Sequence, residues 1–284
     1  MRFEYSVEEP LNREPPVQKL TESFITEQGA YDRNHGPIPH LNADDHVVHV
    51  DGDVHTILEL SVEELRTRFT QHEIVSALQC AGNRRHSMRT LLKEVSGIDC
   101  AGESRAESKI GLGSVKWLER ITVQRDESTN HYQRFDYKRL PPQATDVEAA
   151  RKYWELTPAL QDMPINSVIA IPQSGQTVRL NSDDTLEVKG YAIPQGNQGP
   201  VVKVEVSTDI GQTWTECNIL AGGESESKWA WSLWMVSVRA QRGTQRLLSR
   251  ATDKGGNVQT GEPVWNLRGV AYDGHGEARD LNVI

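Results

Sequence analysis

The second half of this 284-residue chain alternates between apolar and polar positions in short runs. Turn-forming residues separate the runs, as in Asp209-Ile210-Gly211 and Asp253-Lys254-Gly255-Gly256-Asn257. Alternation of period two, broken by such turns, predicts β-strands with one buried face. The expected strands are Asn166 to Ile171, Thr177 to Leu180, Thr185 to Ala192, Val201 to Ser207, Thr213 to Ile219, Trp229 to Val236 and Arg246 to Thr252. Such a set indicates an immunoglobulin-like sandwich, although the chain has no Cys-Trp-Cys framework.

The first half mixes strand and helix patterns. His46 to Val50 alternates and is followed by the turn Asp51-Gly52-Asp53, which predicts a hairpin with a second strand from His55 to Leu60. Ser61, with Glu64 three residues later, predicts a capping box at the start of a short helix.

The segments at the start and in the middle of the chain have weaker patterns. The first 23 residues are rich in Glu and Pro, so we expect them to wrap the surface or to be disordered, with order beginning near Phe24. Val115 to Gln124 predicts a strand that leaves the first domain, and Asp126 to Pro142 predicts a linker across the surface. Asp146 predicts the cap of a short helix in that linker. The expected divisions are an extension, a first domain, a linker and the sandwich: residues 1–23, 24–125, 126–165 and 166–284.

Composition excludes several classes of protein. A mean hydropathy of −0.57 and the lack of an apolar run of about 18 residues argue against a transmembrane helix. A net charge of −9 argues against nucleic acid and anionic membrane as partners. We expect no secretory signal, because the first 16 residues carry acids and prolines, and the three widely spaced cysteines favour a reducing compartment. The sequence therefore predicts a soluble intracellular protein, cytoplasmic or mitochondrial.

One cysteine has neighbours that suggest chemistry. Glu73 to Leu78 predicts a strand that delivers Cys80 at its end, and Gly82 allows a sharp turn after it. Arg84 and Arg85 can then fold back over the sulfur and favour the thiolate, the form that binds soft metals. A buried, inert cysteine followed by two solvated arginines explains the same residues. Neither a second nearby cysteine nor a histidine pair accompanies this thiol, which argues against zinc.

The segment Leu78 to Arg85, LQCAGNRR, resembles the signature around the molybdenum-ligating cysteine of the sulfite oxidase family. That family also contains the molybdenum domain of assimilatory nitrate reductases. Four other segments resemble family motifs in the expected order: Tyr31 to His35, Ser114 to Leu118, Trp229 to Trp231 and Trp265 to Gly269. The resemblance implies an α+β molybdopterin-binding domain followed by an immunoglobulin-like sandwich that forms a homodimer.

The resemblance also implies the roles of single residues. Cys80 would be the protein ligand of a molybdenum that a pterin dithiolene also holds. Arg33, Arg85 and Arg268 would form an anion pocket beside it, since guanidinium groups bind oxyanions through two hydrogen bonds. The expected cofactor contacts are Tyr31, Asp32, Arg33, Asn34, His35, Ser114, Val115 and Lys116. Considered singly, His35 is a hydrogen-bonded loop residue and the arginines are surface ion pairs, but the order of the motifs favours a site. The four tryptophans at 229, 231, 234 and 265 are interpreted as packing residues.

The resemblance is interrupted after Cys100. Ala101 to Ser108 is polar and unlike the family, whereas Gly111 to Lys116 resumes its text. In relatives the missing segment supplies the catalytic tyrosine, further pterin contacts and several core elements. The first domain is therefore expected to be truncated, with exposed apolar surface and a weakly held cofactor.

The implied reaction is oxygen-atom transfer, in which sulfite becomes sulfate and two electrons remain on the metal. Since the chain shows no haem or flavin domain, the electrons are expected to pass to an external acceptor. One alternative is a nitrate reductase-like molybdenum domain. A second is a truncated, non-catalytic homologue that retains only the dimerising sandwich.

Overall fold

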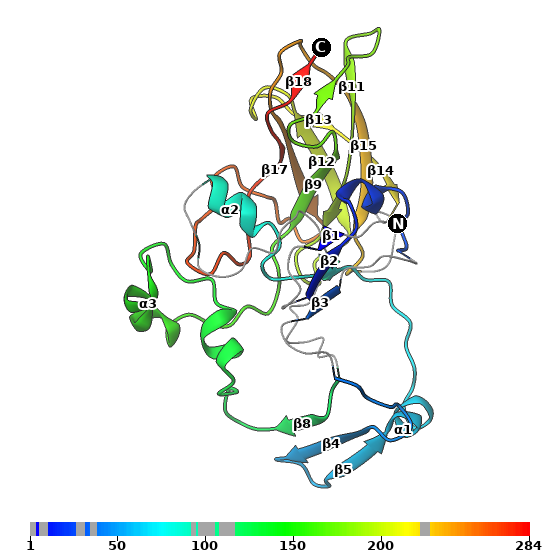
Figure 1. The fold of residues 1–284 in the computed structure, drawn as a ribbon, viewed down its shortest axis with the longest axis vertical. Coiled ribbons are helices and arrows are strands. Elements are labelled where there is room, and N and C mark those ends of the chain that lie inside the picture. Colours follow the sequence, from blue (N-terminus) through cyan, green and yellow to red (C-terminus); the bar gives the residue numbers. More distant parts are fainter. Residues whose placement is uncertain are drawn as a thin grey trace.

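The computed structural model describes residues 4–5, 11–26, 32–34, 39–91, 95, 106–107, 117–221 and 228–284. Two four-stranded sheets form a sandwich in the second half of the chain, with strand orders β14-β15-β11-β9 and β13-β12-β16-β17 (Figure 1). Their bounds are β9 Asn166–Ile171, β11 Thr185–Ile193, β12 Val201–Ser207, β13 Thr215–Glu216, β14 Asn218–Ala221, β15 Ser232–Arg239, β16 Leu247–Asp253 and β17 Gly276–Ala278. A parallel pair, β10 Thr177–Val178 and β18 Asn282–Val283, lies beside them. The fold class expected for this half is confirmed.

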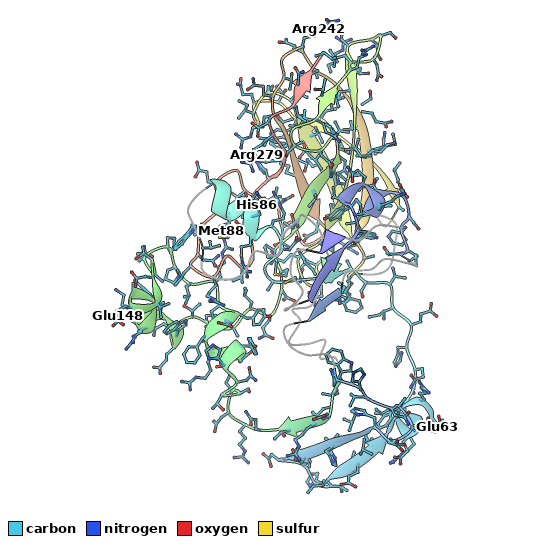
Figure 2. The ribbon with its side chains drawn as sticks, viewed as in Figure 1. Glu63, His86, Met88, Glu148, Arg242 and Arg279 are labelled. Carbon is cyan, nitrogen blue, oxygen red and sulfur yellow. The ribbon has the colours of Figure 1, made fainter. Side chains whose placement is uncertain are left out.

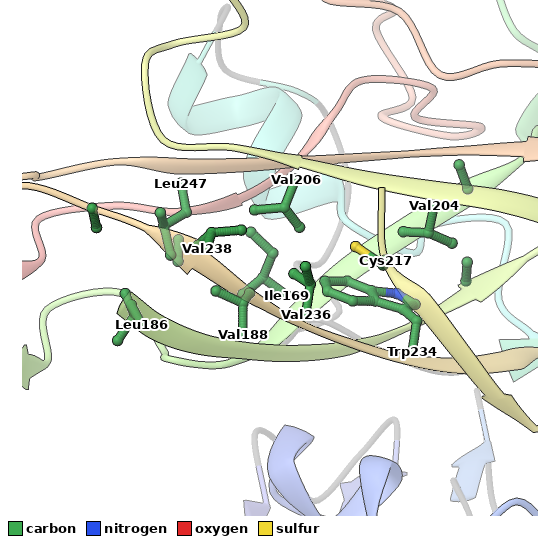
Figure 3. Close-up of a cluster of buried hydrophobic side chains, with 14 of the residues drawn as sticks. Ile169, Leu186, Val188, Val204, Val206, Cys217, Trp234, Val236, Val238 and Leu247 are labelled. Carbon is green, nitrogen blue, oxygen red and sulfur yellow. The ribbon is translucent and has the colours of Figure 1, made fainter. Parts of the chain in front are cut away.

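The main core fills the space between the two sheets (Figure 3). Ile169, Val188 and Trp234 from one sheet meet Val204 and Leu247 from the other, and each of these side chains is at most 1% exposed. Burial of this much apolar surface is the dominant favourable term in folding.

The seven predicted strands are present, with shifts at their ends and one split. Thr213 to Ile219 becomes β13 and β14, because Cys217 leaves one sheet before β14 joins the other. The predicted start of a strand at Trp229 is wrong. β15 begins only at Ser232, because the carbonyl of Trp229 accepts a hydrogen bond from the amide of Ala77, outside the sheet.

The first residues are more ordered than expected. β2 (Leu11–Glu14) pairs with β1 (Glu4–Tyr5) and β3 (Asp32–Asn34), and a 3₁₀-helix, η1, spans Val17–Thr21. Val17 and Leu20 are buried on the outer face of the first sheet, together with Val168, Tyr191 and Trp231. The expectation that order begins near Phe24 is therefore wrong, since these two side chains cover a face of the sheet that would otherwise be exposed.

A small separate sheet has the order β5-β4-β8 (Figure 1). The predicted hairpin is confirmed, with β4 at Val47–Gly52 and β5 at Leu58–Ser61, and β8 at Arg120–Val123 runs parallel to β4. The capping box is confirmed as well: Ser61 Oγ accepts from Glu64 N at 3.1 Å, and the Glu64 carboxylate accepts from Ser61 N at 3.0 Å. These contacts cap α1, Val62–Thr67.

This small sheet has little core of its own. Val48 and Leu60 are the buried apolar residues that it contributes, whereas Ile57, Ile121 and Val123 are 69%, 45% and 43% exposed. Exposed apolar side chains in a sheet are expected when an element that would cover them is missing.

The strand expected before Cys80 is largely absent. Residues 71–77 are irregular, and only β6, Leu78–Gln79, pairs with β7, Ala106–Glu107. Ile74 and Val75 are 63% and 38% exposed. The prediction from Glu73 to Leu78 fails because β-branched residues favour a strand only when a neighbouring surface can pack against them.

The middle segment is packed more deeply than a surface linker. It contains a π-helix, η2 (Tyr132–Asp136), and the predicted helix α3 (Val147–Trp154), whose cap at Asp146 is confirmed. Leu140 and Ala144 are buried beside Met88 of α2 (Arg85–Leu91) and beside Trp265 and Leu267. The surface course predicted for Asp126 to Pro142 is therefore wrong for its second half.

Among the helices of the described residues, none combines the length and the apolar character needed to cross a membrane.

Leu20→Ala is expected to lower the free energy of unfolding of the sandwich by about 3 kcal/mol, because it removes buried apolar atoms from the cluster on the first sheet. Leu220→Ala is the matched control: Leu220 is 56% exposed on β14, so its loss should change the free energy of unfolding by less than about 0.5 kcal/mol. Urea unfolding followed by tryptophan fluorescence measures both, and equal effects would contradict the packing role of Leu20.

Candidate functional site

Cys80 lies at the start of a tight turn between β6 and α2. The amide of Asn83 donates to the carbonyl of Cys80 at 2.9 Å, and the amide of Arg85 donates to the carbonyl of Gly82 at 3.0 Å. Cys80 is half-buried and forms no disulfide. The thiol therefore sits on a rigid turn and remains partly accessible.

Arg84 does not fold back over the sulfur, so that expectation is wrong. Its guanidinium is 3% exposed and donates to Asn166 Oδ1 at 3.0 Å and to the carbonyl of Gly274 at 2.9 Å. The same group lies 4.6 Å above the ring of Tyr272. Arg84 thus holds the Cys80 turn against the sandwich, and its left-handed backbone (φ 59°) directs the side chain there.

Arg85 lies against the turn at Gly82. A Cβ on Gly82 would meet the Arg85 Cζ at 2.9 Å, so glycine is needed there for close approach and not for an unusual φ. On its other side Arg85 Nε donates to the carbonyl of Gly269 at 3.2 Å. Gly269 has φ 59°, a conformation that favours glycine. Two glycines thereby make room for one guanidinium.

Arg268 lies in a loop that is fixed to the Cys80 turn. The side chain of Asn266 accepts from the amide of Val270 at 3.1 Å and donates to its carbonyl at 2.8 Å. The amide of Ala271 then donates to the carbonyl of Ala81 at 2.9 Å. The fold therefore brings Arg85 and the Arg268 loop together beside Cys80, although they are far apart in the sequence.

Arg268 has an acidic neighbour that sequence reasoning missed. Its Nη2 lies 3.0 Å from Asp136 Oδ1, and both side chains are about a quarter exposed. Asp136 ends η2, inside the segment interpreted only as a linker. The negative charge of Asp136 offsets part of the positive charge that Arg268 would present to a bound anion.

Several predicted site residues lie outside the described residues, namely Tyr31, His35, Ser114, Val115 and Lys116. Asp32, Arg33 and Asn34 form β3, and only their backbone is described. The cofactor contacts and the third arginine of the anion pocket therefore stay predictions.

The residues beside Cys80 fit a bound group that brings its own metal ligands. Among the described residues, no cluster of three or more His, Cys, Asp or Glu could hold a metal. Gln79 is fully buried, yet neither amide atom has a hydrogen-bond partner there, and Asn83 Nδ2 is also buried and unsatisfied. Buried polar atoms normally have partners, so a polar group at this turn would satisfy these two side chains.

Two family models match the chain. The oxidoreductase molybdopterin-binding domain matches residues 35–108, and the Mo-co oxidoreductase dimerisation domain matches residues 157–274. Sulfite oxidase of Gallus gallus is 29% identical over 93% of this chain and 74% of its own length, and mitochondrial sulfite oxidase of Rattus norvegicus is 32% identical over 92% and 62%. Nitrate reductase [NADH] 1 of Phaseolus vulgaris is 27% identical over 92% of this chain and 40% of its own. The chain thus spans less than two thirds of the rat protein.

A solved structure has the same fold. The sulfane dehydrogenase SoxCD of Paracoccus pantotrophus matches with a TM-score of 0.70 at 20% identity, over 97% of this chain and 86% of that one. This likeness supports the arrangement of a molybdopterin-binding domain followed by a sandwich.

The alignments also bear on the interrupted segment. The alignment with the Gallus gallus protein spans 348 positions, whereas 93% of 284 residues is about 264, so 348 − 264 leaves about 84 positions without a counterpart in this chain. The loss is internal to the alignment, and its place after Cys100 stays a prediction.

Arg84→Ala is expected to lower the free energy of unfolding by about 3 kcal/mol, because it leaves buried oxygens of Asn166 and Gly274 without donors. Arg84→Gly loses the same bonds but relieves the left-handed backbone, so it should be less destabilising than Arg84→Ala by about 1 kcal/mol. Arg242→Ala, at an exposed turn on the far tip of the sandwich (Figure 2), is the control and should stay within about 0.5 kcal/mol of the unchanged protein. Denaturant unfolding distinguishes the three variants. A change of less than about 0.5 kcal/mol in Arg84→Ala would show that the hydrogen bonds of Arg84 to the sandwich are dispensable.

Proposed function

Because the chain belongs to the sulfite oxidase family of molybdopterin oxidoreductases, we propose that it oxidises sulfite to sulfate in a molybdenum-dependent reaction. The observation that carries the proposal is the packing of the Cys80 turn against Arg85 and the loop of Arg268. This arrangement joins a soft sulfur donor to two cationic groups, which suits a soft metal beside an oxyanion site.

Each residue has a distinct part in the proposal. Cys80 ligates the metal, and the buried amides of Gln79 and Asn83 hydrogen-bond to the cofactor. Bound molybdenum–molybdopterin supplies oxygen-atom transfer and accepts two electrons. Arg85 and Arg268 bind and orient sulfite through charge-assisted hydrogen bonds. Arg33 joins them, and the remaining cofactor contacts come from Tyr31, Asp32, Asn34, His35, Ser114, Val115 and Lys116.

We also propose an oligomeric state, an electron acceptor and a location on the basis of the family. The match to a dimerisation domain supports a homodimer formed through the sandwich. Electrons pass to an external acceptor. The chain divides into an extension, a molybdopterin-binding domain, a linker and the dimerising sandwich, at residues 1–23, 24–125, 126–165 and 166–284. Several relatives are mitochondrial sulfite oxidases, which supports a mitochondrial or cytoplasmic place for this chain.

A second candidate function is that of a dimerising homologue without catalysis. The poorly covered β5-β4-β8 sheet and the roughly 84 missing positions favour it. Molybdenum analysis of freshly purified protein, combined with a sulfite oxidation assay using ferricyanide as acceptor, distinguishes the two functions. Bound metal with turnover supports the oxidase, and metal-free, inactive dimers would support the second function. Nitrate reduction in the same preparation would favour the nitrate reductase-like alternative.

Cys80→Ser is expected to abolish sulfite oxidation and to lower bound molybdenum below about a tenth of the unchanged protein, because a hydroxyl is a harder and less acidic ligand. Metal analysis and steady-state kinetics measure both quantities. Cys217→Ser is the control, since Cys217 lies in the sandwich core, where burial raises the pKa of its thiol to about 12. Full turnover by the Cys80 variant would overturn the proposed ligand.

Arg268→Gln is expected to raise the KM for sulfite about tenfold, because it removes a charge-assisted hydrogen bond to an anion. Asp136→Asn should lower the KM several-fold, since it removes the carboxylate 3.0 Å from Arg268. Arg125→Gln, at a side chain that is 88% exposed, is the control and should leave the KM unchanged. An unchanged KM in both the Arg268 and the Asp136 variants would place Arg268 outside the substrate site.

A further inference from the structure

The β13-β12-β16-β17 sheet carries a pocket of about 630 Å³ that the proposed function does not use. Leu248 and Arg250 of β16 line it together with Arg246, the residue just before that strand, because side chains two residues apart along an extended chain point to the same side. Other walls are formed by Trp214, just before β13, and by His275 and Glu277, at the start of β17. The pocket thus combines guanidinium groups with aromatic rings.

The charged side chains that line this pocket are two cations, Arg246 and Arg250, and two anions, Glu262 and Glu277. Two carboxylates, of Glu205 and Glu277, lie within 3.5 Å of four cations: Lys203, Arg246, Arg250 and Arg279. Glu262 also lines the pocket but is exposed, so solvent screens its charge. With the charge of Glu262 screened, the two lining arginines outnumber the one largely buried lining carboxylate, that of Glu277, which favours an anionic ligand.

The two pocket arginines keep donors that the protein does not use. Arg250 bonds to Glu205 through Nε at 2.9 Å, and its two terminal nitrogens have no partner among the described residues. Arg246 bonds to Glu277 through Nη2 at 2.6 Å, while its buried Nε has no hydrogen-bond partner in the same part of the chain. A buried N–H is normally paired, so the unpaired donor points to a missing acceptor.

The rings in the pocket give it an apolar side. The Arg250 guanidinium lies 4.1 Å above the ring of Trp214, and the ring of His275 meets Trp214 edge-on at 5.1 Å. Burial lowers the pKa of His275, and the charges of Arg250 and Arg84 lower it further, against the opposing effect of Glu277. A neutral His275 at pH 7 leaves the arginines as the cationic groups of the pocket.

We propose that this pocket binds a small organic anion whose carboxylate or other oxyanion group pairs with Arg246 and Arg250 and whose flat body lies against Trp214. Guanidinium groups suit such anions because their planar N–H fork matches two oxygens. The volume falls in the range of small-molecule sites and is too large for a bare ion alone.

Isothermal titration calorimetry with benzoate tests the proposal. Benzoate should bind, whereas benzamide, of the same shape but uncharged, should bind at least tenfold more weakly. Arg250→Gln should weaken benzoate binding at least tenfold, and Arg242→Gln, at an exposed turn of the same sandwich, should not change it. Equal affinities for the two probes, or an unchanged affinity in Arg250→Gln, would overturn the proposal.

A measurement on the unchanged protein covers the case in which Arg250→Gln does not fold. Titration of the His275 ring protons by NMR should show that saturating benzoate raises the pKa of His275, because a bound carboxylate offsets the neighbouring guanidinium charges. An unchanged pKa would place the anion elsewhere. The Cys80→Ser variant should bind benzoate as tightly as the unchanged protein. A negative result for the anion pocket can therefore be distinguished from a negative result for the proposed oxidase function.

Discussion

The buried guanidinium of Arg84 is the contact on which the arrangement of the two halves depends. A charged group at 3% exposure is stable only when its donors are used, and here oxygens of the sandwich and of the loop after Tyr272 accept them. Since Arg84 lies four residues after Cys80, fixing this side chain also fixes the turn that carries the thiol. The site therefore takes its rigidity from the sandwich and not from the domain to which its sequence motif belongs.

This dependence matters because the two halves of the chain are unequally packed. The sandwich has a continuous core between two sheets, and Trp234 and Leu247 have almost no exposed surface. The β5-β4-β8 sheet buries few apolar side chains and stands apart from the sandwich (Figure 1). Since buried apolar area supplies most of the stability of a domain, the small sheet adds little of its own.

Local patterns in the sequence predicted an element correctly wherever the residues that stabilise it lie within the element itself. The Ser61 capping box, the Asp146 cap and the strand Val201–Ser207 follow from residues within one element. The strand expected from Glu73 failed because no neighbouring surface packs against it. Val17 and Leu20 were missed because the surface that they cover lies about 150 to 210 residues away along the chain. At the site, motif order placed Cys80, Arg85 and Arg268 in one region. The direction of Arg84 and the approach of Asp136 could not be predicted, since both depend on tertiary contacts.

The packing of Val17 and Leu20 on the first sheet has a practical consequence for anyone who shortens this protein. Residues 1–23 resemble a dispensable tail in composition, so removal of this segment is the obvious way to shorten the chain. Trimming would uncover the apolar surface around Val168, Tyr191 and Trp231, and the indole N–H of Trp231 would lose its bond to the carbonyl of Phe24 if the cut extended past that residue. A bare sheet face of this kind promotes self-association. A fragment that starts at Leu11 keeps Val17 and Leu20 on the sheet and is the better choice for a shortened protein.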